Sequence, residues 1–86
     1  MFTNKAKDGR NNLCGIKVAQ IRTSMKISQK ALADLLQLHG LEIDKNVIQR
    51  IECGKRFVTD IELCGLSKVF NISVDELLGM KNSDIE

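Results

Sequence analysis

The sequence predicts an all-α fold of five short helices, and three observations support this prediction. Apolar residues recur at spacings of three and four along most of the chain, as they do on one face of an α-helix. Ser, Thr or Asp stands immediately before four of the five segments, where its side chain can cap the first turn. The 86 residues include no proline and only three aromatic residues, which favours one small core of packed Leu, Ile and Val.

The N-terminal part of the chain is predicted to form an arm followed by a helix. Residues 1–12 have no apolar periodicity and are expected to form a flexible arm. A first helix is predicted over about residues 13–24. Its inward-facing stripe comprises Cys14, Val18, Ile21 and Met25.

Two further helices are predicted in the middle of the chain, joined by a short connection that contains Gly40. Ser28 is expected to cap the second helix, which ends at about Leu38. Asp44 is expected to cap the third, over about residues 45–52. Their inward-facing residues are Ala31, Leu32, Leu35, Leu36, Val47, Ile48 and Ile51.

The C-terminal part is predicted to contain a fourth helix capped by Thr59 and a short fifth helix capped by Ser73. The domain would then span residues 13–80, followed by a short tail over residues 81–86. Leu63, Leu66 and Phe70 are expected to face inward. Two interpretations remain open for Leu77 and Leu78, which belong either to the core or, with Met80 and the tail to Glu86, to a dimer contact.

Charge is distributed unevenly along the chain, although its net value is only +2. Residues 1–30 contain seven Lys or Arg and one Asp, whereas residues 57–86 contain two Lys and six Asp or Glu. This polarity fits a molecule with one face toward a polyanion and another toward solvent or a second subunit. Ordinary scatter of charge is the alternative.

The sequence contains no pattern typical of a metal site, a cofactor site or an enzyme. Cys14, Cys53 and Cys64 form no CxxC pair, and His39 is the only histidine, so no metal and no cofactor are expected. There is no P-loop, no GxGxxG and no nucleophile–His–Asp spacing. No apolar run reaches the roughly 18 residues of a membrane helix, and no secretory signal is present, so no membrane partner and a cytoplasmic location are expected.

The outward face of the third predicted helix carries only amide and cationic side chains: Lys45, Asn46, Gln49 and Arg50. In the major groove of DNA, Arg and Lys match guanine, and Asn and Gln match adenine. A merely solvated helix face is the alternative for these four residues taken alone. The short, glycine-containing connection before this helix favours a helix-turn-helix, in which the second of two helices enters the groove.

Four short motifs together resemble the XRE family of Cro and lambda-repressor-like transcriptional regulators. They are SQ at residues 28–29, LA at 32–33, IxxIExGK at 48–55 and NISVDELLG at 71–79. The resemblance covers about residues 14–79. It implies a five-helix lambda-repressor-like DNA-binding domain, here with a lengthened turn between the second and third helices.

The resemblance also implies roles for individual residues. Arg22 and Glu52 are expected to form a structural ion pair between two helices. Gln29 is expected to brace the recognition helix as well as to contact phosphate. The base-reading residues would be Lys45, Asn46, Gln49 and Arg50. The phosphate-contacting residues would be Ser28, Gln29, Gly54, Lys55 and Arg56.

The sequence departs from the family pattern in two places. The LA motif lies about five residues further from Ile48 than is usual, so residues 37–42 hold extra length, as a longer helix or a longer turn. Cys53 occupies a position where the family commonly has Asn. For Cys53, redox sensing and an inert thiol are both compatible with the sequence.

The function expected from these features is sequence-specific binding of double-stranded DNA by a homodimeric transcriptional regulator, a repressor at a palindromic operator. The alternative is a protein-interaction module of the same fold, such as an antitoxin or a subunit that sequesters a regulator, which would bind a protein partner. Lys5, Lys7 and Arg10 in the arm either follow the DNA or belong to a disordered segment.

Overall fold

The computed structural model describes residue 6 and residues 8–79 of the chain. These residues form five helices and, within the described ranges, no strand: α1 (Gly15–Ser24), α2 (Gln29–Leu38), α3 (Lys45–Glu52), α4 (Asp60–Phe70) and α5 (Val74–Leu78). The predicted all-α fold is therefore confirmed. Met80, the tail over residues 81–86, Lys5 and Lys7 lie outside the described residues.

Side-chain caps set the starts of four helices. Ser28, Asp44, Thr59 and Ser73 have extended backbones, and each accepts a hydrogen bond from the amide three residues later. Helix α1 begins differently, because its N-cap residue, Cys14, makes no side-chain cap. Instead, Asn12 Oδ1 accepts a hydrogen bond from the amide of Gly15 at 2.8 Å.

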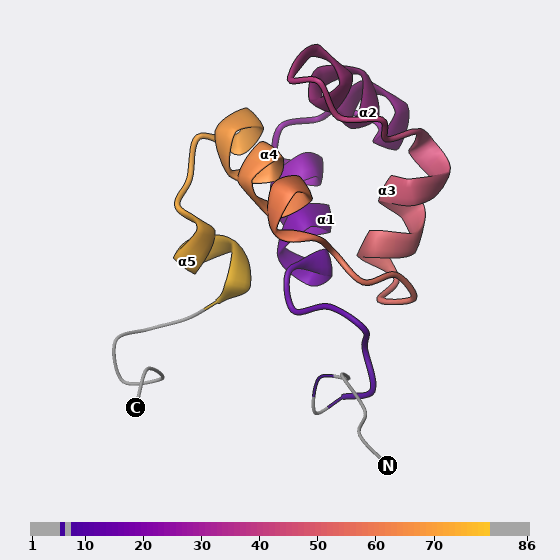
Figure 1. Ribbon diagram of the computed structural model, residues 1–86, viewed down its shortest axis with the longest axis vertical. Helices are drawn as coiled ribbons and strands as arrows, with labels where there is room; N and C mark the ends of the chain where they lie inside the picture. Colours follow the sequence, from indigo (N-terminus) through magenta and orange to yellow (C-terminus); the bar gives the residue numbers. More distant parts are fainter. Residues whose placement is uncertain (1–5, 7, 80–86) are drawn as a thin grey trace.

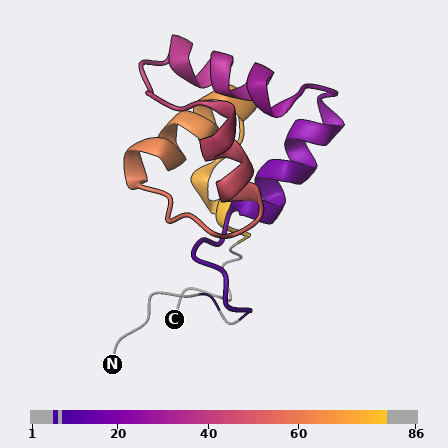
Figure 2. The same ribbon diagram turned by 90° about the vertical axis from the view of Figure 1, so that its right-hand side faces the viewer.

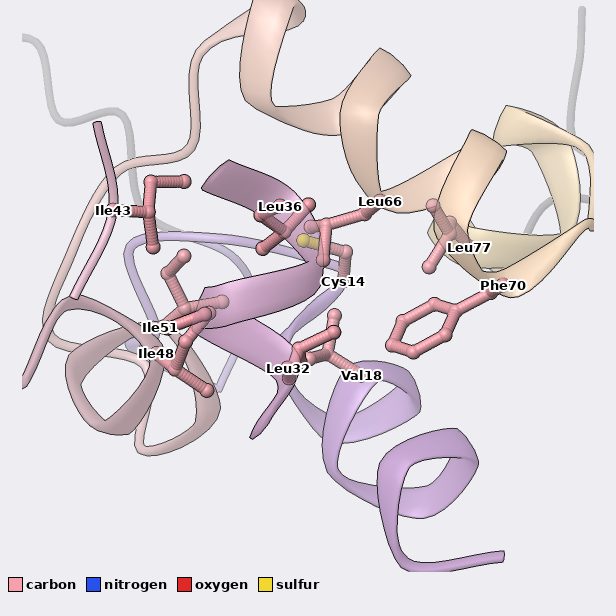
Figure 3. Close-up of a cluster of buried hydrophobic side chains, with 11 residues drawn as sticks. Cys14, Val18, Leu32, Leu36, Ile43, Ile48, Ile51, Leu66, Phe70 and Leu77 are labelled. Carbon is pink, nitrogen blue, oxygen red and sulfur yellow. The ribbon is translucent and has the colours of Figure 1, made fainter. Parts of the chain in front are cut away.

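The five helices pack around one apolar core. In Figure 1, α3 and α5 lie on opposite sides of the molecule, with α1 and α4 between them and α2 above. The core residues, most of them labelled in Figure 3, are Cys14, Val18, Leu32, Ala33, Leu36, Ile43, Ile48, Ile51, Leu66, Phe70 and Leu77. The prediction that Met25 faces inward is wrong, since Met25 follows the last turn of α1 and is 42% exposed.

The extra length between the LA motif and Ile48 is accommodated in the connection between α2 and α3. Helix α2 ends at Leu38, as the sequence predicts, so residues 39–44 form a lengthened turn. Gly40 has a φ of +84°, a left-handed conformation that suits glycine. Gln37 Nε2 donates a hydrogen bond to the carbonyl of Ile43 at 2.9 Å, and Ile43 is buried in the core. The turn is therefore held to the domain at both ends.

The short helix α5 packs its apolar side against the core, while Asp75 and Glu76 are exposed. Leu77 is fully buried and Leu78 packs against the core cluster. The interpretation of Leu77 as a dimer contact is therefore wrong, because a side chain with no exposed surface cannot contact a second subunit. None of the described helices is both long and apolar enough to cross a bilayer.

Candidate nucleic-acid interface

Helix α3 has one buried face and one exposed polar face. Ile48 and Ile51 are fully buried, and this fixes the rotation of the helix about its axis. The side chains on the exposed face are Lys45, Asn46, Gln49 and Arg50, the four that the sequence predicts to read bases. The view of Figure 2 looks onto α3, with α2 above it and the other helices beside and behind it. Within the described part of the chain, no other helix covers this face.

Three helices meet at the carboxylate of Glu52, the last residue of α3. Arg22 of α1 donates from Nε to Glu52 Oε2 at 2.6 Å and from Nη2 to Oε1 at 3.1 Å. Gln29 of α2 donates from Nε2 to Glu52 Oε1 at 3.1 Å. The hydrogen bond to Glu52 raises the pKa of the Arg22 guanidinium. These three side chains hold the C-terminal end of α3 in a fixed orientation relative to α1 and α2.

The other residues that the family resemblance predicts to contact phosphate have different environments. Ser28 and Lys55 are exposed, and the Lys55 amide donates to the carbonyl of Arg50 at 2.9 Å. Gly54 is buried, donates its amide to the carbonyl of Ile51 at 3.1 Å and accepts from the amide of Asn11 at 2.8 Å. Because both backbone groups of Gly54 are engaged within the protein, the structure does not offer them to a phosphate.

Arg56 is also engaged within the protein. Its Nη1 donates to Glu62 Oε1 at 2.7 Å, in an ion pair whose carboxylate side is 11% exposed. Burial raises the pKa of Glu62, but hydrogen bonds from Arg56 and Thr59 and the charge of Arg56 outweigh it, so the pKa lies below its ordinary value. Glu62 also completes the capping box of α4 with Thr59. The pair joins the loop after α3 to the start of α4.

Sequence reasoning missed the residues that hold the C-terminal end of α3. Arg10 Nη2 donates to the carbonyl of Glu52 at 2.6 Å, and Asn12 Nδ2 donates to the carbonyls of Ile51 at 3.0 Å and Arg56 at 2.7 Å. The predicted flexible arm over residues 1–12 is thus hydrogen-bonded to the domain at its end. Asn is a preferred capping residue, and this was the only local signal for Asn12.

The cysteines and the histidine form no metal site. Cys14 is buried, and burial raises the pKa of its thiol. Cys53 and Cys64 are exposed and free, and Cys53 is the C-cap of α3. Within the described residues, no group of three or more His, Cys, Asp or Glu is placed to hold a metal ion.

The fold, with α2 and the exposed polar helix α3 joined by a turn, defines a helix-turn-helix protein. A family model described as helix-turn-helix matches residues 18–77. The chain belongs to this family of XRE-type DNA-binding transcriptional regulators.

The solved structures that are similar to this chain include the following two. The first is the P22 c2 repressor protein in complex with synthetic operator 9T in the presence of Tl⁺, with 27% identity, coverage of 78% of this chain and 94% of that one, and a TM-score of 0.66. The second is the restriction-modification controller protein C.AhdI from Aeromonas hydrophila, with 27% identity, coverage of 73% and 84%, and a TM-score of 0.64. Among curated protein sequences, none matches this chain.

Proposed function

We propose that the chain is a repressor that binds a palindromic operator as a cytoplasmic homodimer and occludes a promoter. One observation carries the proposal: helix α3 buries its apolar side and presents only hydrogen-bonding and cationic groups on the other. A helix anchored in this way can enter a groove about 12 Å wide without exposing apolar surface. The similar structure of a repressor with its operator supports the same mode of binding.

The proposed base contacts come from Lys45, Asn46, Gln49 and Arg50. Lys and Arg donate to guanine O6 and N7, and Asn and Gln form paired hydrogen bonds with adenine N6 and N7. Each good bidentate pair supplies about 1–3 kcal/mol of discrimination against the wrong base. Four such side chains on two turns of one helix are sufficient to select a short half-site.

The proposed phosphate contacts come from Ser28, Gln29 and Lys55, which set the register of the protein on the duplex. Gln29 lies at the first position of α2, where free helix amides and the helix dipole favour an anion. Gly54 and Arg56 are assigned mainly to holding the loop, since the Gly54 amide and Arg56 Nη1 donate within the protein. Ser28 Oγ accepts a hydrogen bond from Ala31 and keeps its own hydrogen to donate, and Gln29 Nε2 has a second hydrogen beside the one that it donates to Glu52. In a homodimer, the two recognition helices would read half-sites about 34 Å apart, one turn of DNA.

The experiment that tests the proposal selects duplexes from a random library with the purified chain and measures affinity against salt. An inverted repeat with half-sites one turn apart, and a log–log salt slope of several units, is expected. Gln49→Ala and Arg50→Ala should each weaken the selected site by about 5- to 150-fold and relax preference at one base pair. Lys68→Ala, an exposed cation on α4, is the matched control and should leave base preference unchanged.

The opposite outcome is equally informative. If no motif is enriched and binding is weak and wholly salt-sensitive, specific repression is excluded. The protein-interaction alternative, an antitoxin or a sequestering subunit, would then explain the fold, and the search would turn to a protein partner.

A further inference from the structure

Residues 10–12, which we call the strap, lie across the C-terminal end of α3 and the loop that follows it. In Figure 2 this segment passes below the lower end of α3. Its hydrogen bonds to carbonyls of α3 and the loop come from the Arg10 and Asn12 side chains and from the backbone and side chain of Asn11. Arg10 Nη2 donates to the carbonyl of Glu52 at 2.6 Å, and Asn12 Nδ2 donates to those of Ile51 at 3.0 Å and Arg56 at 2.7 Å. Asn11 donates from its backbone amide to the carbonyl of Gly54 at 2.8 Å and from Nδ2 to that of Lys55 at 2.9 Å.

Two glycines make room for the strap. A Cβ on Gly54 would lie 2.8 Å from Cζ and 2.9 Å from Cγ of Arg10, so the arginine rests directly on this α-carbon. Gly54 also has a φ of +81°, which disfavours any other residue. A Cβ on Gly15 would lie 2.6 Å from Arg10 Nη2 and 2.7 Å from Asn12 Oδ1. The start of α1, the strap and the end of α3 therefore meet at close backbone contact.

The charge of Arg10 suits the position it occupies. The last four carbonyls of a helix have no partner within the helix, and they carry the negative end of its dipole. Arg10 donates to two of these carbonyls in α3, those of Glu52 and, at 3.4 Å, Ile51. A guanidinium there supplies donors to these carbonyls, and its positive charge interacts favourably with the negative end of the helix dipole. Its Nη2 donates to these carbonyls of the protein itself, whereas its buried Nε has no hydrogen-bond partner among the described residues.

We propose that the strap is a positioning element for DNA reading: Arg10 holds the end of α3 and the 53–56 loop so that base-reading and phosphate-contacting groups keep one register. This proposal rests on the DNA-binding function proposed above. Arg10 acts through α3 and does not itself touch DNA. Lys55 is the phosphate-contacting residue that the strap contacts directly, because its carbonyl accepts a hydrogen bond from Asn11 Nδ2 at 2.9 Å.

The proposal is tested by measuring the affinity of the Arg10→Ala variant for operator DNA and for non-specific DNA as a function of salt concentration. Loss of positioning should weaken operator binding about tenfold, equivalent to about 1.4 kcal/mol, and leave non-specific binding within about twofold. The salt slope should stay the same. Arg10→Lys keeps the charge and one donor, and should recover part of the operator affinity. Lys68→Ala, which removes an exposed cation from α4, should match the wild type in the ratio of the two affinities.

Two results would overturn the proposal. An equal loss of operator and non-specific affinity, with a salt slope reduced by about 0.9, would show that Arg10 contacts phosphate directly. Unchanged operator affinity in Arg10→Ala, with the wild type selecting its operator normally, would reduce the strap to a structural role. Failure of the wild-type chain to select any operator is a different result, because it removes the proposed function itself and the positioning role with it.

A second variant and a second readout distinguish a loss of positioning from misfolding of the Arg10→Ala variant. Asn11→Ala removes one hydrogen bond to Lys55 without changing charge, and should weaken operator binding about threefold. Amide hydrogen exchange of the free protein should be faster at Cys53, Gly54 and Lys55 in Arg10→Ala, while the α4 amides keep the wild-type rate. Equal acceleration everywhere would indicate global destabilisation and contradict a positioning role.

Discussion

Removing the ion pair between Arg22 and Glu52 should reveal how strongly the recognition helix is joined to the rest of the domain. The pair is bidentate, with distances of 2.6 and 3.1 Å, and its side chains are only 18% and 10% exposed. Hydrogen bonds to charged groups contribute about 1.5–3 kcal/mol, and loss of one partner leaves the other charge partly buried. We therefore expect Glu52→Leu to lower the free energy of unfolding by about 3 kcal/mol, because Gln29 loses its acceptor too.

The magnitude is best measured as a double-mutant cycle with Arg22→Met. That single change should destabilise by about 2–3 kcal/mol, part of it from the Arg22 hydrogen bond to the carbonyl of Ile27 at 2.8 Å. The double variant should lose much less than the sum, which gives a coupling of about 2 kcal/mol. Urea denaturation followed by circular dichroism provides the free energies, and each single variant should lower Tm by about 10–20 °C.

A coupling below about 0.5 kcal/mol would refute this reasoning, because it would place the pair among exposed salt bridges of little value. The pair Lys30 and Asp34 on α2 is the internal control. Its side chains are 72% and 55% exposed, so the same cycle there should give about 0.3–0.5 kcal/mol.

Two further predictions concern the ends of helices. Gly15→Ala should destabilise the domain although Ala favours a helix by about 1 kcal/mol, because its Cβ would collide with the carbonyl of Ile51; a higher Tm in thermal unfolding would contradict the close contact. Glu62→Gln should lower stability by about 2 kcal/mol at pH 7. Since the folded-state pKa of Glu62 is lowered, its contribution is present above the unfolded pKa of about 4.3 and is lost as pH falls through the folded value. The difference between wild type and Glu62→Gln should therefore shrink below about pH 4 in denaturation curves, and a constant difference would exclude the pairing with Arg56 as its cause.

The ends of the helices show how far local sequence patterns reach. Asp44 caps α3 at the predicted position, because capping is decided by residues a few positions apart, and Gly54 follows the end of α3 in a left-handed conformation. Helix α1 starts at Gly15, two residues after the predicted start at residue 13, and the Gly15 amide is capped by Asn12, which lies outside the apolar stripe. From the sequence, the extra length after α2 could form either a longer helix or a longer turn. The structure has the longer turn, in which Ile43 is buried in the core.

By itself, then, the sequence determined the five helices, the side-chain caps of four of them and the polar outer face of α3, because caps and the 3.6-residue period depend on residues that are close together in the sequence. Only the tertiary structure decided what supports that face. The contacts of Arg10 with Glu52 and of Asn12 with Ile51 join residues about forty positions apart, and such contacts leave no periodic trace in the sequence. They form because a buried carbonyl at a helix end needs a donor, and folding brings the strap to it.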